Sequence, residues 1–69
     1  MGKENNMNVN DAIAEQVRDR YKGQSGYVVA WYNKKDPGDF WFGPISTGLP
    51  DWDDSWDEDP IMKYFIVKV

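Results

Sequence analysis

The chain has 69 residues, a formal net charge of −4 at neutral pH, and eleven aromatic residues, but no cysteine and no histidine. This length is near the lower limit at which a hydrophobic core supports a fold without staples, and it indicates a single domain. The composition excludes disulfides and zinc sites of the thiolate or imidazole type. Aromatic side chains, which bury roughly 150–250 Å² each, are expected to supply much of the core.

The charges are unevenly distributed along the chain. Residues 1–35 carry six lysines and arginines against four acidic residues, whereas residues 36–69 carry two lysines against eight acidic residues. Nucleic-acid binding depends on Lys and Arg side chains that neutralise phosphates. We therefore expect no direct binding to nucleic acid, and a basic protein surface is the better match for the acidic half.

No stretch of the sequence approaches the roughly 20 apolar residues that a membrane span needs. The N-terminus is polar and lacks the apolar region of a secretory signal. These features predict a soluble, cytoplasmic protein that does not contact membranes.

Residues 1–7 predict a flexible N-terminal arm, and residues 8–69 predict a single α+β domain. A helix is expected over 8–22, with Asn8 as its N-cap and Gly23 at the C′ position. Its apolar residues recur at every fourth position: Val9, Ile13, Val17 and Tyr21. This spacing places them in one narrow stripe on the helix surface.

Three segments rich in β-branched and aromatic residues predict strands: 26–33, 39–45 and 61–69. Between the first two strands, KKDPGD predicts a hairpin turn of type II, with Pro37 and Gly38 at its central positions. The sequence thus predicts one helix packed on one face of a three-stranded antiparallel sheet.

The predicted strands are apolar on both faces. In the first strand, Tyr27, Val29 and Trp31 point away from Val28, Ala30 and Tyr32; in the third, Phe65 and Val67 point away from Met62, Tyr64 and Ile66. One helix covers one face. The second face is therefore expected to be covered by residues 46–60, by another copy of the chain, or by a partner.

The stretch PDWDDSWDEDP (50–60) concentrates negative charge and tryptophan between two prolines. Its six carboxylates belong to Asp51, Asp53, Asp54, Asp57, Glu58 and Asp59. Trp52 and Trp56 are four residues apart, so their rings could lie on one side of a helical turn and cover the open sheet face. The alternative is direct contact with a partner, since tryptophan is favoured at interface hot spots.

Catalysis is not expected, because the chain has no histidine or cysteine and no serine in a recognisable nucleophile setting. Spaced aspartates resemble the start of an EF-hand loop, but a loop starting at Asp51 would need glycine where Trp56 stands and glutamate where Met62 stands. Both positions fail. We predict no metal site and no cofactor, while weak, non-specific divalent binding stays open.

The acidic stretch has a charge density of the same order as a nucleic acid. Six carboxylates over roughly 30 Å of extended chain average one charge per ~5 Å, against one phosphate per ~3.4 Å along a DNA strand. Such a segment could occupy the basic channel of a nucleic-acid-binding protein, with tryptophans where bases would stack. The alternative is a solvated acidic loop that keeps the protein soluble.

With its length, its lack of cysteine, its helix-plus-sheet layout and the cluster DWDDSWDED, the chain resembles the small acidic inhibitors that phages encode against host defence. These include anti-CRISPR proteins and DNA-mimicking anti-restriction proteins. The resemblance implies that the protein acts in the host cytoplasm, where it blocks the DNA-binding, PAM-reading surface of a CRISPR effector or similar complex. The six carboxylates would form the contact, with Asp36 and Asp39 as secondary contacts. The basic residues Arg18, Arg20, Lys34 and Lys35 would have to face away.

The alternative function is a small interaction module whose aromatic sheet face binds a protein or a second copy of the chain. Trp31 and Trp41 are reminiscent of the aromatic grooves that bind polyproline helices, although their spacing matches no such family. The protein is expected to be a monomer or a homodimer.

Overall fold

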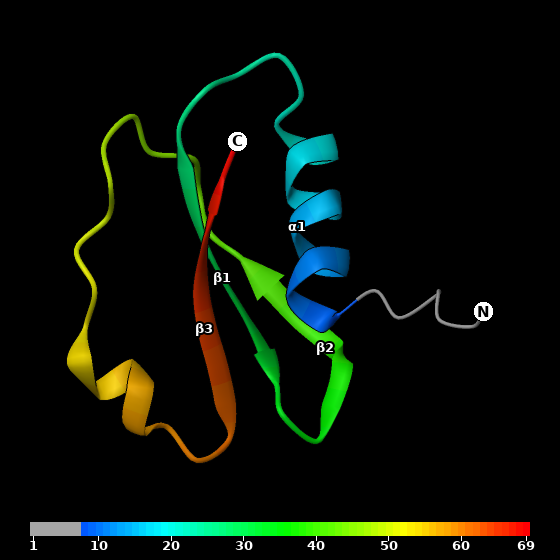
Figure 1. The fold of residues 1–69 in the computed structure, drawn as a ribbon, viewed down its shortest axis with the longest axis vertical. Helices are drawn as coiled ribbons and strands as arrows, with labels where there is room; N and C mark the ends of the chain where they lie inside the picture. The colour runs from blue at the N-terminus through cyan, green and yellow to red at the C-terminus, as the bar shows by residue number, and fades with distance from the viewer. Residues whose placement is uncertain (1–7) are drawn as a thin grey trace.

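The computed structural model describes residues 8–69, so the predicted arm over 1–7 lies outside the described residues. Along the chain the described elements are α1 (Val9–Arg20), β1 (Tyr27–Asn33), β2 (Asp36–Phe42), the 3₁₀ helix η1 (Asp54–Glu58) and β3 (Met62–Lys68) (Figure 1). The predicted α+β class, with one helix and an antiparallel sheet in the order α-β-β-β, is confirmed for this part of the chain.

The ends of α1 follow from local hydrogen bonding. The side-chain oxygen of Asn8 accepts from the backbone N–H groups of Asn10 and Asp11, at 2.8 and 3.4 Å, so the predicted N-cap is confirmed. The helix ends earlier than expected, at Arg20. Gly23 has the expected positive φ of 87°, but it lies in a turn beyond the C-cap residue Tyr21 and not at C′.

In the described residues, α1 has 12 residues, and no helix there is long and apolar enough to cross a membrane.

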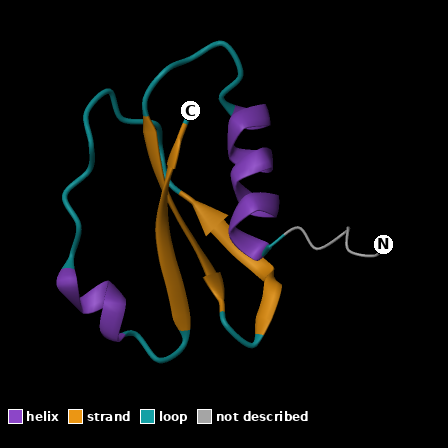
Figure 2. Ribbon diagram, in the orientation of Figure 1, coloured by secondary structure: helices purple, strands orange, loops and turns teal. Residues whose placement is uncertain are grey.

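β1 is the central strand of the sheet, which has the order β2-β1-β3 with both pairings antiparallel. Figure 2 shows α1 on one side of the strands and the long connection that contains η1 on the other. Strands β2 and β3 are therefore the two rims of the sheet. The chain travels from one rim to the other through residues 43–61, which positions η1 beside β3.

The predicted hairpin turn at Pro37 and Gly38 is wrong. The chain reverses at Lys34 and Lys35. There the Asn33 side chain accepts a hydrogen bond from the Lys35 N–H (2.9 Å), and the backbone of Asn33 pairs with that of Asp36. Residues 37–39 then lie within β2 as an irregularity in the pairing. A proline is tolerated there because β2 is an edge strand, whose outward N–H groups have no ladder partner.

The predicted second strand over 39–45 is also shifted, because β2 ends at Phe42. Pro44 has no N–H to donate to a ladder. The chain still returns to β1 once, where Tyr27 and Ser46 exchange two backbone hydrogen bonds of 2.8 Å.

The core lies between α1 and the sheet. The buried hydrophobic residues in the described chain are Ile13, Ala14, Val17, Val28, Ala30 and Val67. Tyr21 reinforces this layer, since its ring packs edge-to-face on Phe42 and its hydroxyl donates to the Gly43 carbonyl at 3.1 Å. The register confirms the expected face assignment, with Trp31 opposite Tyr64 on the face away from α1 and Ala30 opposite Phe65 on the α1 face.

Candidate functional site

The acidic segment, residues 51–59, is folded and not an extended loop. Asp53 is the N-cap of η1, and its Oδ1 accepts hydrogen bonds from the Ser55 N–H (2.9 Å) and the Ser55 hydroxyl (2.8 Å). The Trp56 N–H donates to the Asp53 carbonyl at 2.9 Å, which closes the first turn. A run of like charges thus adopts a short helix, because Asp53, one of its own residues, caps it.

Asp59 fixes the other end of the segment to the sheet. Its Oδ1 accepts from the backbone N–H groups of Ile61 and Met62, at 2.8 and 2.9 Å, where β3 begins. Lys34, in the hairpin turn, donates from its Nζ to the Asp59 carbonyl (2.6 Å) and from its backbone N–H to the Ile61 carbonyl (2.8 Å). Lys34 therefore lies beside the acidic segment, contrary to the expectation that it would face away.

Aromatic rings hold η1 against the sheet. We call this group the aromatic stack; its members, in spatial order, are Trp31, Tyr64, Trp56 and Trp52. Trp56 stacks on Tyr64 with a centroid distance of 5.0 Å and an interplanar angle of 13°. Trp52 then packs edge-to-face on Trp56 at 5.1 Å. The acidic segment is thereby held as a ridge on the side of the sheet opposite α1.

The two tryptophans of the segment differ in exposure. Trp56 is half-buried between Tyr64 and Trp52, whereas Trp52 is 36% exposed and donates its indole N–H to Asp57 Oδ2 at 3.0 Å. The expected cover of the sheet face is therefore supplied mainly by Trp56. Trp52 is left with one accessible side.

The structure divides the six carboxylates into two groups. Asp53, Asp57 and Asp59 accept the hydrogen bonds described above, and so contribute to the local fold. Asp51, Asp54 and Glu58 are exposed and accept none of the hydrogen bonds found within residues 8–69. These three carboxylates are the ones free to meet a partner without loss of an internal contact.

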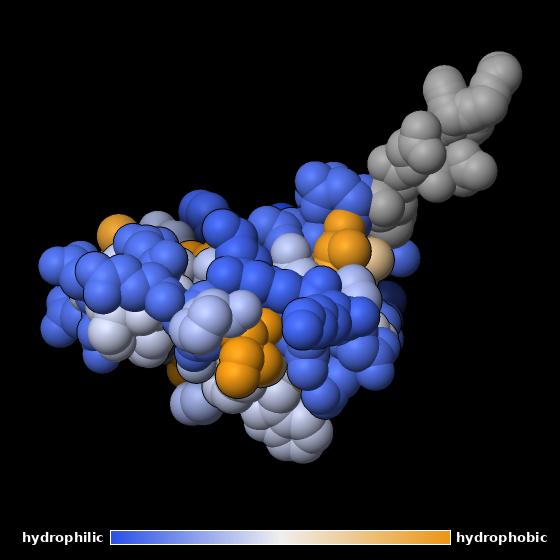
Figure 3. Space-filling view, turned by 90° about the horizontal axis from the view of Figure 1, so that it is seen from below, coloured by the Kyte–Doolittle hydropathy of each residue, from blue (hydrophilic) through white to orange (hydrophobic). Residues whose placement is uncertain are grey.

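The secondary candidates Asp36 and Asp39 do not join the ridge. Both are exposed on β2, at the rim of the sheet opposite β3 and η1. The turn residues Lys34 and Lys35 lie between these aspartates and the ridge along the hairpin. Viewed from the hairpin end, Figure 3 shows hydrophilic surface over both sides of the molecule with an apolar patch between them.

Among residues 8–69, no group of three or more acidic side chains has an arrangement that would hold a metal ion.

Hydrogen bonds at the two ends of the acidic segment lower the pKa values of Asp53 and Asp59. The Ser55 hydroxyl, and next its backbone N–H, hold the pKa of Asp53 below its ordinary value of 3.8. The backbone N–H groups of Met62 and Ile61, helped by the charge of Lys34, lower the pKa of Asp59 in the same way. In both cases hydrogen bonds to the charged form outweigh the opposing effect of desolvation.

A pH dependence of stability follows from these two groups. A carboxylate whose pKa is lower in the folded state than in the unfolded state stabilises the folded protein at pH values above the unfolded pKa. That stabilisation is lost as the pH falls through the folded pKa. The melting temperature is expected to fall below about pH 4, and to fall less steeply in the variant Asp53→Asn/Asp59→Asn. Thermal melts by circular dichroism between pH 2 and 7 would measure this. Asp54→Asn, which removes a charge without removing a cap, should retain the wild-type acid loss; equal slopes in all three proteins would contradict the capping role.

No protein-family model, no curated protein and no solved structure matches this chain. The site therefore has to be interpreted from its own geometry.

Sequence reasoning located the acidic segment but missed the residues that support it. Tyr64 could have been identified as a support, since strand alternation already placed it on the open face with Trp31. Lys34 could not, because its contact with Asp59 depends on where the hairpin reverses.

Proposed function

We propose that the protein is a non-enzymatic inhibitor whose ridge over residues 51–59 occupies a basic, nucleic-acid-binding surface of a partner protein or complex. A CRISPR effector, whose PAM-reading surface uses arginines to hold duplex DNA, has the required chemistry. The observation that supports this most directly is the rigid support of an exposed charge cluster. Asp54 and Glu58 are presented on η1, which Asp53 caps and the aromatic stack holds in place, and Asp51 lies in the segment just before it.

Preorganisation is the physical reason to favour this function over a solvated acidic loop. A flexible loop loses conformational entropy when a partner orders it, which reduces affinity. A loop that only maintained solubility would need no capped first turn, no hydrogen bonds from Asp59 to the start of β3 and no ring stacked on the sheet. Residues 51–59 are already ordered in the folded protein, so they lose less conformational entropy when a partner binds. Charge pairs with the partner therefore contribute more of their energy to affinity.

The test is a binding experiment with two variants of equal net charge. The ridge variant is Asp51→Asn/Asp54→Asn/Glu58→Gln, and the control is Asp11→Asn/Glu15→Gln/Asp19→Asn, whose positions are exposed on α1. Each removes three negative charges from the net −4. The first step is to capture partners from bacterial lysate with the wild-type protein at low salt and to elute them with rising salt.

With a captured partner, the ridge variant is expected to bind about 10- to 100-fold more weakly, since each lost charge pair contributes roughly 0.5–1 kcal/mol. The control should bind within about threefold of wild type. Wild-type affinity should also fall steeply with salt, because exposed charges are screened within ~8 Å at physiological ionic strength. Equal affinities of the two variants would contradict the proposal, since only net charge would then matter.

A second function, an interaction module that uses the aromatic sheet face, is favoured by the incomplete cover of that face. On β1, Val29 and Trp31 are half-buried, whereas Val28 and Ala30 beneath α1 are fully buried. Leu49, in the connection on this side, is 68% exposed. Binding through this face is expected to persist in high salt and to be unaffected by the ridge variant.

A further inference from the structure

The two rims of the sheet are protected unequally against pairing with another strand. Exposed charges, prolines and irregular pairing are the usual means by which edge strands avoid association. On β3 the exposed lysines Lys63 and Lys68 and the neighbouring η1 provide this protection. On β2, Asp36, Pro37 and the irregularity over 37–39 protect the first half of the strand.

The second half of β2 has none of these features. We call residues 40–43 (Phe40, Trp41, Phe42 and Gly43) the aromatic edge. Phe40, Trp41 and Phe42 end β2 in a regular antiparallel register with β1, Gly43 follows directly after the strand, and Trp41 is 68% exposed. The Gly43 N–H donates to the Val29 carbonyl at 2.9 Å, so the N–H of Gly43 points toward β1. Because these directions alternate along a strand, the N–H and C=O groups of Phe42 and Phe40 point away from the sheet.

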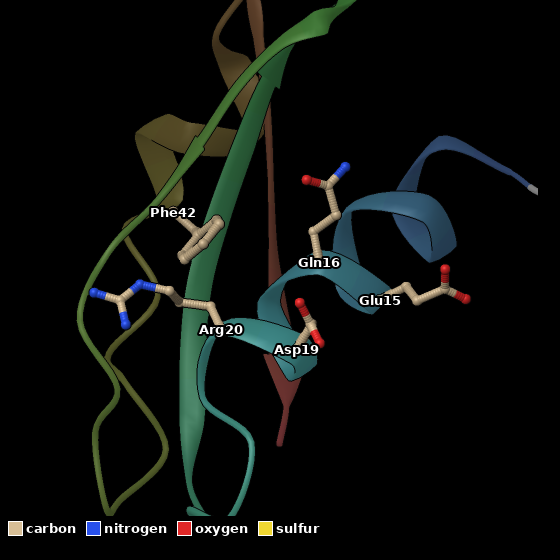
Figure 4. A pocket seen from close by; sticks show the side chains of 5 residues that line it. All are labelled: Glu15, Gln16, Asp19, Arg20 and Phe42. Atoms are coloured by element: carbon tan, nitrogen blue, oxygen red, sulfur yellow. The ribbon is translucent and has the colours of Figure 1, made fainter.

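Two open cavities flank the aromatic edge. One, of about 450 Å³, is lined by Phe42 and by α1 side chains, including Arg20, Asp19 and Glu15. The other, of about 440 Å³, lies between Arg20, Trp41 and the residues that follow β2. Figure 4 shows the Arg20 side chain extending toward the strands beside Phe42, while the Glu15 carboxylate points away. The positive charge of Arg20 therefore lies at the C-terminal end of the aromatic edge. The negative charge of Asp39 lies at its other end, immediately before Phe40.

We infer that the aromatic edge pairs with the same edge of a second copy of this chain. Antiparallel pairing with Phe40 opposite Phe42 of the second copy would make four backbone hydrogen bonds and place Trp41 against Trp41 of the second copy on the two-fold axis. The same axis carries Asp39 to Gly43 of the second copy, which lines one cavity together with Arg20 of that copy. The pairing would thus bring an acidic residue of one copy near a basic residue of the other, twice across the axis.

This self-complementarity is the reason to choose a second copy over an unrelated peptide. An arbitrary extended peptide would satisfy the outward backbone groups, but it would not supply an acidic group before and a basic group after an aromatic run, in the order that the two-fold axis brings together. The dimer has one continuous sheet, with a ridge at each outer rim. Both ridges remain accessible, because η1 contacts β3 and not β2.

The first test is the solution mass as a function of concentration, measured by sedimentation velocity. The mass of wild type is expected to rise from 8.0 kDa toward twice that value as concentration increases. Trp41→Lys places like charges against each other on the axis and should stay at the monomer mass at every concentration. Because Trp41 is mostly exposed, this variant should fold, which its melting curve would confirm. A wild type that stays monomeric at millimolar concentration, or a Trp41→Lys variant that still dimerises, overturns the inference.

A charge swap tests the register. Arg20→Asp and Asp39→Arg each place like charges across the interface, so each should weaken the dimer by about tenfold or more. The double variant Arg20→Asp/Asp39→Arg restores opposite charges and should recover most of the wild-type dimer constant. A double variant no stronger than the single ones overturns the proposed register. The ridge variant should dimerise like wild type, so the result is independent of whether the ridge binds a partner.

Discussion

Replacing Gly26 with alanine is expected to destabilise the protein by about 3 kcal/mol or more, out of a total near 5 kcal/mol for a domain of this size. Gly26 has a φ of 154°, where side chains are strained, and an added Cβ would collide with the Ser46 carbonyl oxygen. It would also lie 3.0 Å from Ile45 Cγ1. The obstacle is backbone held by the Tyr27–Ser46 bridge, so it cannot move aside without breaking that bridge.

Urea denaturation of Gly26→Ala should therefore show a large loss of the free energy of unfolding, or a protein unfolded in buffer. Gly48→Ala is the matched control, because Gly48 has no atom within 4 Å of an added Cβ and no positive φ. Its stability should lie within about 0.5 kcal/mol of wild type. Equal stabilities of the two variants would contradict the prediction, because they would show that the Ser46 backbone can move away from residue 26 at little cost.

Trp56→Ala is expected to cost about 2–3 kcal/mol. The substitution removes the stack on Tyr64 and the edge-to-face contact with Trp52, and each aromatic pair contributes about 0.5–1.5 kcal/mol beyond the area it buries. It also exposes the sheet face beneath. At about 4–8 °C per kcal/mol for a small domain, the melting temperature should fall by roughly 10–25 °C.

Trp52→Ala is the control for this prediction. It removes a more exposed ring and one hydrogen bond to Asp57, so a loss of about 1 kcal/mol is expected. Near-ultraviolet circular dichroism should report the loss of the coupled indoles in both variants. Only Trp56→Ala should have a much lower melting temperature. If Trp52→Ala is the more damaging, the assignment of Trp56 as the residue that anchors the ridge is wrong.

Much of the fold could be predicted from the sequence because its signals are local. Asn8 caps α1 through atoms two and three residues away, and the spacing of Ile13 and Val17 forms the buried stripe whatever the helix packs against. The alternation in β1 likewise predicted that Trp31 and Ala30 lie on opposite faces. These features depend on periodicity and on near neighbours.

The hairpin shows where a local signal was overruled. Pro37 and Gly38 are typical turn residues, but the chain reverses at Lys34 and Lys35. Reversal there leaves Phe40 opposite Tyr32 and directs it toward the core, where it packs beside α1. The gain from burying apolar side chains on one face exceeds the preference of a dipeptide for a turn.

The sequence by itself determined the charge of residues 51–59, the presence of two tryptophans among them, and the presence of a second apolar sheet face. Only the tertiary structure decided which carboxylates are free. Trp56 can anchor η1 because the register of β1 and β3 brings Tyr64 beneath it, and Asp59 meets Lys34 because the hairpin reverses early. These contacts join residues 8 to 25 positions apart, and their geometry depends on strand pairing that no local pattern specifies.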